Sequence, residues 1–484
     1  MIRAAVPVLL ALASLGCTGA EGSGRGQLPD RDAEAPCAGW TYDVAPARWV
    51  LPAGVSTGAF TRAERGAADC VEGLPATRLF DLTGDDRPDF VMLSDCDDPA
   101  VGASMWRVWP AVAGGFGDEI PWALPADSAP GAFGVLRSAA DCSGEGDLPA
   151  FRLDRLDGDE LMDLVVTESC ADETLADGAW RVYPSTGVGF GPGVLRPITP
   201  SYDSGSFVTP GNEESCGATE NSPAWGAVDL DGDGPIDIVL TDTCDTETVG
   251  LTHWARLAND GAAFSAAEPW GIPGELAADR LSRDLGACAI GMPDYFLLDV
   301  VGDDQPDLVV PHPCAAQGSD WTVYSNEGAG FASIGAVRRA PWSLNVLVNQ
   351  RERTAPDCAR SFPAWVLDDA DGDQDADLTI TASCTDLAVG NARWDLYAYT
   401  ASPGGGEGWS DAAPIALPTG YSTGSFAGGT GETPGCAGTA NRPAWVRRDL
   451  DGDGKPELVV TEACADPTIG TDAWLVYEMT CAAE

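Results

Sequence analysis

Six short acidic loops recur along the chain at intervals of 70 to 80 residues, each just before a short apolar strand. In the clearest copy, Asp229, Asp231, Asp233 and Asp237 occupy positions 1, 3, 5 and 9 of a DxDGDxxxD pattern. Carboxylate oxygens at these positions, with a backbone carbonyl from position 7, suit a hard cation that takes about six to eight oxygen ligands, as calcium does. The spacing therefore predicts a calcium site in this loop.

The other copies differ in the number of ligand oxygens that they offer. The fifth and sixth loops are complete, whereas Thr83 weakens the first at position 3 and Val301 leaves the fourth one oxygen short. We therefore expect three strong calcium sites and two weaker ones. The predicted ligands outside the third loop are Asp81, Thr83, Asp85 and Asp89 in the first loop, Asp299, Asp303 and Asp307 in the fourth, Asp369, Asp371, Asp373 and Asp377 in the fifth, and Asp449, Asp451, Asp453 and Glu457 in the sixth.

The second loop differs most, because Arg155 occupies position 1 ahead of Asp157, Asp159 and Asp163. A guanidinium pairs strongly with carboxylates and can take the place of a cation among them, so we predict no metal in this loop. Ordinary Asp/Gly turns use the same residues for backbone reasons. One copy does not separate the two interpretations, but six copies in one phase favour calcium.

The acidic loops resemble those of the FG-GAP/VCBS repeats in calcium-binding β-propellers, the family that includes the head of integrin α chains. The resemblance covers residues 37–484, and the family's Gly-Phe step recurs as Gly189-Phe190 and Gly330-Phe331. It implies a propeller fold, calcium held in blade hairpins, and a binding or adhesion role. It does not identify a ligand.

The rest of each repeat predicts the same architecture. A copy contains a Trp or Leu-Pro segment, a Pro-Ala-Trp segment such as the one ending at Trp225, a Leu-Val-Val strand after the acidic loop, and a Trp-x-Val-Tyr strand such as residues 180–183. These are four short strands without a helical period, and four strands form one propeller blade. We therefore predict an all-β, six-bladed propeller.

The tryptophans and the strand count lead to two further predictions. Recurring tryptophans suit a packed core between blades better than a sugar-stacking surface, which is the alternative interpretation. The Trp strand type occurs seven times, from Trp40 and Tyr42 at the start to Trp474 at the end. The surplus N-terminal strand is predicted to lie beside the Trp474 strand and to close the ring, because closure removes open sheet edges.

Twelve of the 15 cysteines fall two per repeat, one before and one after the acidic loop. Their spacing and the presence of only two histidines favour disulfides over zinc. Cys37 and Cys481 remain, and we predict that they clasp the two ends of the propeller, although sequence does not prove connectivity. The pairs within repeats are Cys70/Cys96, Cys142/Cys170, Cys216/Cys244, Cys288/Cys314, Cys358/Cys384 and Cys436/Cys464.

Residues 1–17 look like a bacterial lipoprotein signal, with a basic start at Arg3, an apolar stretch, and Ser14-Leu15-Gly16-Cys17. Cys17 is then the lipidated residue that anchors the protein to the outer membrane or cell surface, and plain secretion is the alternative. Residues 18–36 are rich in Gly, Asp and Glu and are expected to form a flexible tether. Many cysteines agree with export, because disulfides persist in oxidising compartments.

The formal charge of −48 excludes nucleic acid as a partner, since phosphate binding needs clustered basic residues. No catalytic residue is predicted, because neither His253 nor His312 has a nucleophile or acid partner at a recognisable spacing. We expect a rigid surface that binds a protein or glycan, with the membrane contacted through a lipid anchor. A propeller enzyme acting on polysaccharide and a structural envelope component are the alternatives.

Overall fold

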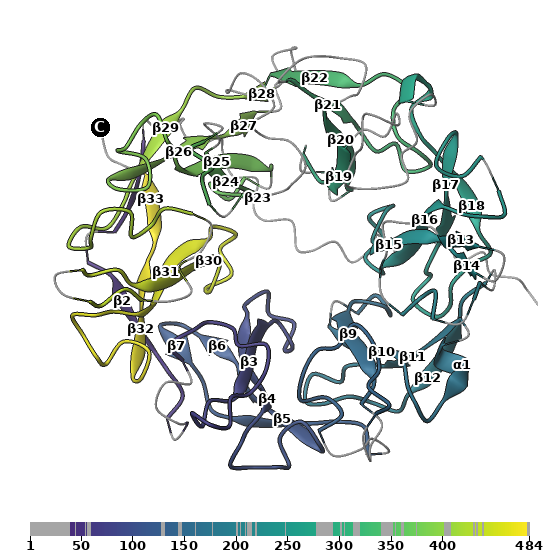
Figure 1. Cartoon of the computed structure of the whole chain (residues 1–484), viewed down its shortest axis with the longest axis horizontal. Coiled ribbons are helices and arrows are strands. Elements are labelled where there is room, and N and C mark those ends of the chain that lie inside the picture. Colours follow the sequence, from purple (N-terminus) through teal and green to yellow (C-terminus); the bar gives the residue numbers. More distant parts are fainter. Residues whose placement is uncertain are drawn as a thin grey trace, which may run out of the picture.

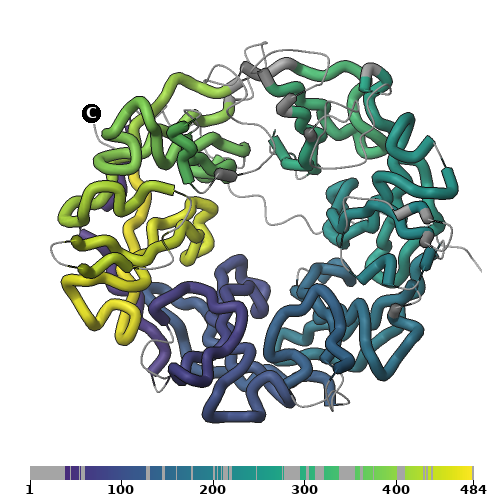
Figure 2. The backbone as a smooth tube through the Cα atoms, viewed as in Figure 1, coloured from purple at the N-terminus to yellow at the C-terminus, as the bar shows by residue number. Residues whose placement is uncertain are grey.

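The structure is a computed structural model, and it describes residues 39–481 with internal gaps. The backbone runs once around a ring (Figure 2). The predicted signal with Cys17, the tether, and Cys37 lie outside the described residues. The internal gaps are residues 44, 54, 56–59, 127–130, 144–147, 160, 177, 200–201, 204, 209, 211–214, 218–219, 247, 277–293, 301–302, 304, 313–319, 340–351, 354, 360–362, 374, 401–407, 429–430, 432–433 and 438–439.

Six blades, each built on four antiparallel strands, stand around this ring (Figure 1), which confirms the predicted six-bladed propeller. In each blade the innermost strand comes first and the others follow outward. The first three blades are β3 (Ala76–Phe80), β4 (Asp89–Ser94), β5 (Met105–Trp109) and β8 (Ile120–Ala123); β9 (Ala150–Asp154), β10 (Asp163–Glu168), β11 (Ala179–Tyr183) and β12 (Val194–Pro197); and β15 (Ala224–Val228), β16 (Asp237–Asp242), β17 (His253–Leu257) and β18 (Glu268–Gly271).

The other three blades repeat this order, except that the outermost strand of the sixth blade comes from the start of the chain. They are β19 (Asp294–Leu298), β20 (Asp307–His312), β21 (Asp320–Tyr324) and β22 (Ala336–Arg339); β24 (Ala364–Asp368), β25 (Asp377–Ala382), β26 (Arg393–Tyr397) and β29 (Ala413–Ala416); and β30 (Ala444–Arg448), β31 (Glu457–Glu462), β32 (Ala473–Tyr477) and β2 (Ala47–Val50).

The remaining elements are short, and some of them extend the blades. They are β1 (Trp40–Tyr42), β6 (Ala111–Val112), β7 (Gly115–Phe116), β13 (Ser215–Gly217), β14 (Glu220–Ser222), β23 (Glu352–Arg353), β27 (Tyr399–Thr400), β28 (Gly408–Trp409), β33 (Met479–Cys481), the helical turn α1 (Glu173–Ala176) and the 3-10 turn η1 (Gly274–Leu276). The four-strand repeat did not predict that some blades carry a further ribbon against their innermost strand. In the first blade, for example, Arg65 pairs with Thr77 and Asp69 with Leu74.

The second strand of a blade is buried on both faces because the neighbouring blades stack against it. Strands β16 and β25 are buried along their whole length, as expected of strands that are covered on both faces. The tryptophans of the third strands are at most 1% exposed, which confirms that they form the core. They are Trp106, Trp180, Trp254, Trp321, Trp394 and Trp474.

One tryptophan contact recurs at the junctions between blades. The indole N–H of Trp106 donates to the carbonyl of Phe133, in the segment that leads to the next blade, at 3.0 Å. Trp180 donates in the same way to Phe207 at 2.8 Å. At the junction that closes the ring, Trp474 donates to the carbonyl of Phe60 at 2.8 Å. The closing junction is therefore built like the internal ones.

Ring closure follows the predicted principle but uses a different strand. The strand that pairs with the Trp474 strand is β2, with Trp49 opposite Trp474 in antiparallel register. The predicted strand, β1, instead lies between β29 of the fifth blade and β33 at the end of the chain. The Trp40 prediction was wrong because β1 and β2 are both short strands with a tryptophan, and pairing between distant segments decides which one enters the blade.

Five of the predicted disulfides are present among the described residues: Cys70–Cys96, Cys142–Cys170, Cys216–Cys244, Cys358–Cys384 and Cys436–Cys464. Cys288 and Cys314 lie outside the described residues. Cys481 is also disulfide-bonded, and its predicted partner Cys37 lies outside them. Disulfides of this number indicate an oxidising, extracytoplasmic compartment. A helix long and apolar enough to cross a membrane does not occur in the described part of the chain.

Candidate metal centres

The acidic loops connect the first and second strands of the blades, so equivalent loops lie at the same end of each blade. In the fifth loop the carboxylate of Asp369 at position 1 accepts the backbone N–H of Gly372 at position 4, at 2.7 Å. Asp449 accepts that of Gly452 at the same distance. Both glycines have positive φ angles, 81° and 76°, which glycine adopts at little cost. The loop sequence therefore folds back on its first carboxylate.

The closing carboxylate at position 9 is buried in every blade. Asp377 is 0% exposed and accepts the backbone N–H of Ala370 within its own loop and that of Tyr399 beyond the third strand, at 3.1 and 2.7 Å. Position 9 therefore ties the loop to the third strand as well as facing the other acids. The equivalent residues are Asp89, Asp163, Asp237, Asp307 and Glu457.

The sixth loop brings all four of its predicted ligands together. Asp449, Asp451, Asp453 and Glu457 each offer an oxygen within 4.8 Å of the others. Burial, with the neighbouring carboxylates, raises the pKa of Glu457 to about 9. A cavity of 240 Å³ beside the loop is lined by Asp451, Glu457 and Glu478. Crowded oxygen donors with space beside them fit a hard divalent cation such as calcium.

The fifth loop brings Asp369, Asp371 and Asp377 into one group, which does not include Asp373. The Oδ1 atom of Asp371 is buried and has no hydrogen-bond partner among the described residues. Burial and the charges of Asp373 and Asp369 raise the pKa of Asp371 to about 7. A buried carboxylate oxygen without a partner is costly, and a bound cation would satisfy it. This loop also fits calcium.

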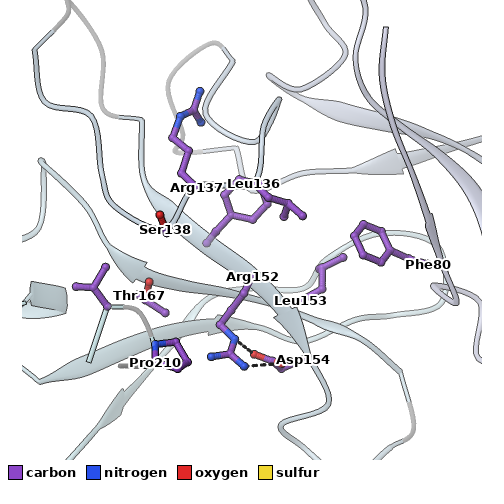
Figure 3. A pocket seen from close by; sticks show the side chains of 11 residues that line it. Phe80, Leu136, Arg137, Ser138, Arg152, Leu153, Asp154, Thr167 and Pro210 are labelled. Carbon is purple, nitrogen blue, oxygen red and sulfur yellow. Dashed lines mark hydrogen bonds and ion pairs between the residues drawn. The ribbon is translucent and has the colours of Figure 1, made fainter. Parts of the chain in front are cut away.

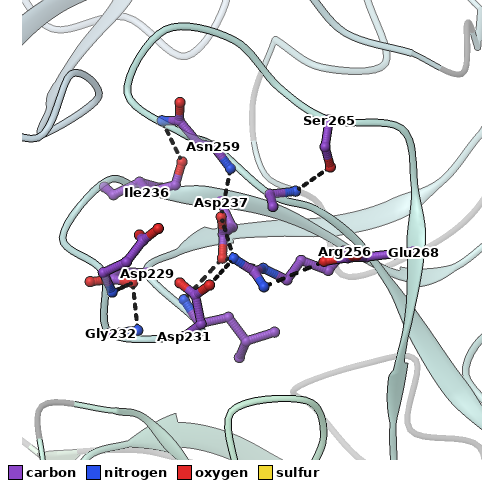
Figure 4. Close-up of polar contacts among 12 residues, drawn as sticks. Asp229, Asp231, Gly232, Ile236, Asp237, Arg256, Asn259, Ser265 and Glu268 are labelled. Carbon is purple, nitrogen blue, oxygen red and sulfur yellow. Dashed lines mark hydrogen bonds and ion pairs between the residues drawn. The ribbon is translucent and has the colours of Figure 1, made fainter. Parts of the chain in front are cut away.

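The third loop, the clearest copy by sequence, contains a positive charge supplied by the protein itself (Figure 4). Asp229, Asp231 and Asp237 come together, but the guanidinium of Arg256 lies among them. Its Nε donates to Asp237 at 2.7 Å, and one terminal nitrogen contacts Asp231. The Arg256 side chain is only 7% exposed. The sequence pattern did not reveal this arginine because it lies 19 residues beyond the closing carboxylate.

The second loop differs from its prediction in the residue with which the Arg155 side chain pairs. Arg155 forms its ion pair with Asp81 of the first loop, at 3.8 Å, and no ion pair with a described carboxylate of its own loop. Asp157, Asp159 and Asp163 nevertheless come together as a group that could hold a metal ion. The expected replacement of the cation by Arg155 was therefore wrong, because the arginine extends across the blade junction.

The first and fourth loops assemble less completely. Thr83 donates its hydroxyl to Asp89 at 3.2 Å. Asp299 and Asp307 of the fourth loop accept backbone N–H groups, and Val301 lies outside the described residues. Neither loop forms a group of three carboxylates in the part of the chain that the structure describes. These loops were predicted to be the weaker sites.

Neighbouring loops interlock around the ring, a feature that the sequence pattern did not predict. A Cβ atom added at Gly372, position 4 of the fifth loop, would lie 2.8 Å from the Lys455 side chain at position 7 of the sixth loop. In the same way Gly452 of the sixth loop faces Arg87 of the first. The glycine at position 4 therefore also makes room for the next loop.

Of the two histidines, only His253 has a side chain that the structure describes. His253 contacts the hydroxyl of Thr252, with 2.9 Å between Nδ1 and Oγ1. The side chain of His312 lies outside what the structure describes.

A cavity of 520 Å³ near the second blade is lined by Phe80, Arg137 and Arg152, among others (Figure 3). Its Arg152 turns toward Asp154, with 3.0 Å between the hydrogen-bonded atoms.

No family model and no curated protein matches this chain. Among solved structures it is similar to a chain of the Photorhabdus luminescens Tc holotoxin pore, with a TM-score of 0.44 and 15% identity over 91% of this chain and 15% of that chain. It is also similar to an α-L-arabinofuranosidase from Fusarium graminearum, with a TM-score of 0.32 and 9% identity over 91% of this chain and 98% of that chain. An exo-β-1,3-galactanase from Phanerochaete chrysosporium has a TM-score of 0.22 and 11% identity over 73% of this chain and 78% of that chain. These likenesses concern the fold alone.

Proposed function

We propose that this protein is an exported, calcium-stabilised propeller of the FG-GAP/VCBS type that presents a rigid ring for binding a protein or glycan. The observation that carries the proposal is the sixth loop, where four carboxylates lie within 4.8 Å of one another. The buried, unpartnered oxygen of Asp371 in the fifth loop supports it. Lipidation at Cys17 would hold the propeller at the bacterial outer membrane or cell surface.

Calcium would be a structural ligand in this proposal. When bound, it neutralises the carboxylates of each loop and so favours the folded blade over the unfolded chain. The protein's own residues arrange the site: the position 4 glycine allows the turn, and the buried position 9 carboxylate ties the loop to the third strand.

The two acidic residues that line one described cavity are both engaged by the protein, which supports a binding role there over catalysis. Hydrolysis of a glycoside usually needs two carboxyl groups placed on either side of the bond. In the 620 Å³ cavity between the sixth and first blades, Glu64 is already paired with Arg78 and Arg448. Asp69 accepts the backbone N–H groups of Val71 and Glu72.

The calcium proposal is tested by thermal unfolding with a chelator and with millimolar calcium. Extracellular calcium modules bind with dissociation constants of roughly 10⁻⁴ to 10⁻³ M, so we expect the melting temperature to rise by several degrees in calcium. Magnesium at the same ionic strength is the control. Equal melting temperatures in chelator and calcium, together with a crystal grown in calcium that shows no ion at Asp449 or Asp369, would contradict the assignment.

The binding proposal is tested separately, by screening the purified ectodomain against glycan and protein arrays in calcium. We expect a saturable ligand that the reduced, unfolded protein does not bind. Failure to find one, with calcium stabilisation intact, would favour a structural role in the envelope.

A further inference from the structure

A cavity of 620 Å³ lies between the innermost strands of the sixth and first blades. Five stretches line it: residues within 62–69 in the inner ribbon of the first blade, Arg78 on β3, Gly431, residues within 445–448 on β30, and Thr461 on β31. A cavity of this size suits a small molecule or one unit of a polymer.

The charge of this cavity is opposite to that of the protein. The chain has 75 acidic residues and only 27 basic ones, yet Arg62, Arg65, Arg78 and Arg448 all line this cavity. Its lining contains two acidic residues, Glu64 and Asp69. The lining therefore has an excess of two positive charges within a strongly negative molecule.

Glu64 contacts two of the four arginines and fixes their positions. Its carboxylate accepts a hydrogen bond from Arg448 of the sixth blade at 2.8 Å and one from Arg78 of the first blade at 3.4 Å. The hydroxyl of Thr461 donates to the carbonyl of Thr61 at 3.0 Å, which joins the same two blades beside the cavity. These contacts hold the cavity open in one arrangement.

Arg62 and Arg65 have no comparable partner. Neither forms an ion pair with a residue that the structure describes, and the Nε atom of Arg65 is buried without a hydrogen-bond partner. Burial, with the neighbouring charge of Arg62, lowers the pKa of Arg65. Glu462 interacts with Arg62 only as a more distant charge. The charges of Asp69 and Glu72 oppose this repulsion without forming an ion pair with Arg65 among the described residues, so Arg65 keeps a donor for an added anion.

The corresponding cavity near the second blade differs in this respect. There Arg152 pairs with Asp154 (Figure 3). Arg137 donates to the carbonyls of Ala132 and Val135 at 3.0 and 3.3 Å. Its two arginines are thus satisfied by the protein. Of these two cavities, only the one between the sixth and first blades contains arginine side chains without an ion pair or hydrogen-bond partner among the described residues. The repeat alone therefore does not produce this feature.

We propose that the cavity between the sixth and first blades binds the anionic group of an acidic sugar unit, a carboxylate or a sulfate ester, on Arg62 and Arg65. Guanidinium groups bind planar and tetrahedral oxyanions through paired N–H donors. The lining also contains the apolar residues Ala63 and Val446, which can pack against the face of a sugar ring. The inference rests on the proposed binding role and specifies its ligand class.

The test is calorimetric titration of the calcium-loaded, disulfide-intact protein with oligogalacturonate, with a sulfated oligosaccharide and with a neutral oligosaccharide of the same length. We expect one of the two acidic sugars to bind, to weaken as salt is added, and the neutral sugar not to bind. The stronger of the two acidic probes identifies the group. Binding of the neutral sugar with equal affinity, or of neither acidic sugar, would overturn the proposal.

Two variants decide whether the cavity is the site. The double variant Arg62→Gln/Arg65→Gln should lose at least tenfold in affinity, while Arg152→Gln in the second cavity should bind as the wild type does. An equal loss in both variants would place the site elsewhere. Melting temperatures in calcium show whether each variant is folded, and they separate this outcome from failure of the calcium proposal. Stronger binding of an acidic peptide than of either sugar would overturn the sugar assignment.

Discussion

Arg256 occupies a position that is apolar in the other five repeats. The second residue after the third-strand tryptophan is Val108, Val182, Val323, Leu396 or Val476 in those blades. In the third blade this position carries a buried guanidinium that pairs with Asp231 and Asp237. A fixed positive charge among the ligands opposes a second cation there, so the third loop should be the weakest calcium site among the four that form carboxylate groups.

Replacing Arg256 with leucine tests this directly. We expect Arg256→Leu to bind one more calcium ion per protein than the wild type, because it removes the competing charge and restores the side chain found in the fifth blade. Calorimetry in chelexed buffer measures the stoichiometry. Arg181→Leu is the matched control, since Arg181 lies on the equivalent strand and pairs with Asp172 away from the acidic loop. Unchanged stoichiometry in Arg256→Leu would show that the arginine does not exclude the ion.

The closing carboxylates predict an unusual pH dependence for the metal-free protein. Burial raises the pKa of Glu457 from 4.5 to about 9, and burial with Asp371 raises that of Asp377 to about 9. The folded state therefore keeps these two carboxyl groups protonated at pH values above 4.5, where the unfolded state has released the protons. Their contribution to the free energy of unfolding is complete at low pH and is lost as pH rises toward 9.

We expect the melting temperature in chelator to fall between pH 5 and pH 8, and to change much less in calcium, because the bound ion replaces the protons. Thermal melts at constant ionic strength measure both curves. A metal-free protein whose stability rises over this interval would contradict the assignment of raised pKa values to these two acids.

Strand β2 completes the sixth blade. The contribution of its buried tryptophan to stability can be measured separately from that of its exposed ion pair. Trp49 is 4% exposed and packs edge-on against Phe116 on β7, the next strand of the same sheet, with 6.0 Å between the ring centroids. Trp49→Ala should lower the free energy of unfolding by about 3–5 kcal/mol, the usual cost of removing a buried large aromatic side chain. Denaturant unfolding in calcium measures the loss.

Arg48 on the same strand is the control. Its ion pair with Asp466 is exposed, with side-chain exposures of 48% and 43%, and such pairs are worth at most about 1 kcal/mol. Arg48→Ala should therefore lower stability by less than about 1 kcal/mol. Equal losses for the two variants would mean that Trp49 does not anchor the closing strand.

Local patterns in the sequence were sufficient to predict the blades but not how distant segments meet. The acidic loop, the apolar second strand and the tryptophan strand are each contained in a few residues, and their repetition predicted six blades and the disulfide pairs within them. The positions of Arg155, Arg256 and β1 depend on neighbours in other blades or far along the chain. Side chains as long as arginine cross such junctions, and spacing along one repeat does not describe them.

The two ends of the described chain lie side by side, with Trp40 opposite Cys481 in the β1–β33 pair. The predicted Cys37–Cys481 disulfide would add a covalent link worth roughly 5 kcal/mol by the chain-entropy estimate for so long a loop. Cys481→Ser should lower the melting temperature and free one thiol, while the disulfides within the blades persist. Non-reducing peptide mapping gives the partner of Cys481, and a link from Cys481 to a blade cysteine would exclude the clasp.

Because Trp474 meets Phe60 as Trp106 meets Phe133, the junction that contains the chain ends is equivalent to the internal ones. This tryptophan contact therefore does not require the chain ends to lie at this junction. A circularly permuted chain, with a short peptide joining the present ends and new ends between two other blades, keeps every such junction.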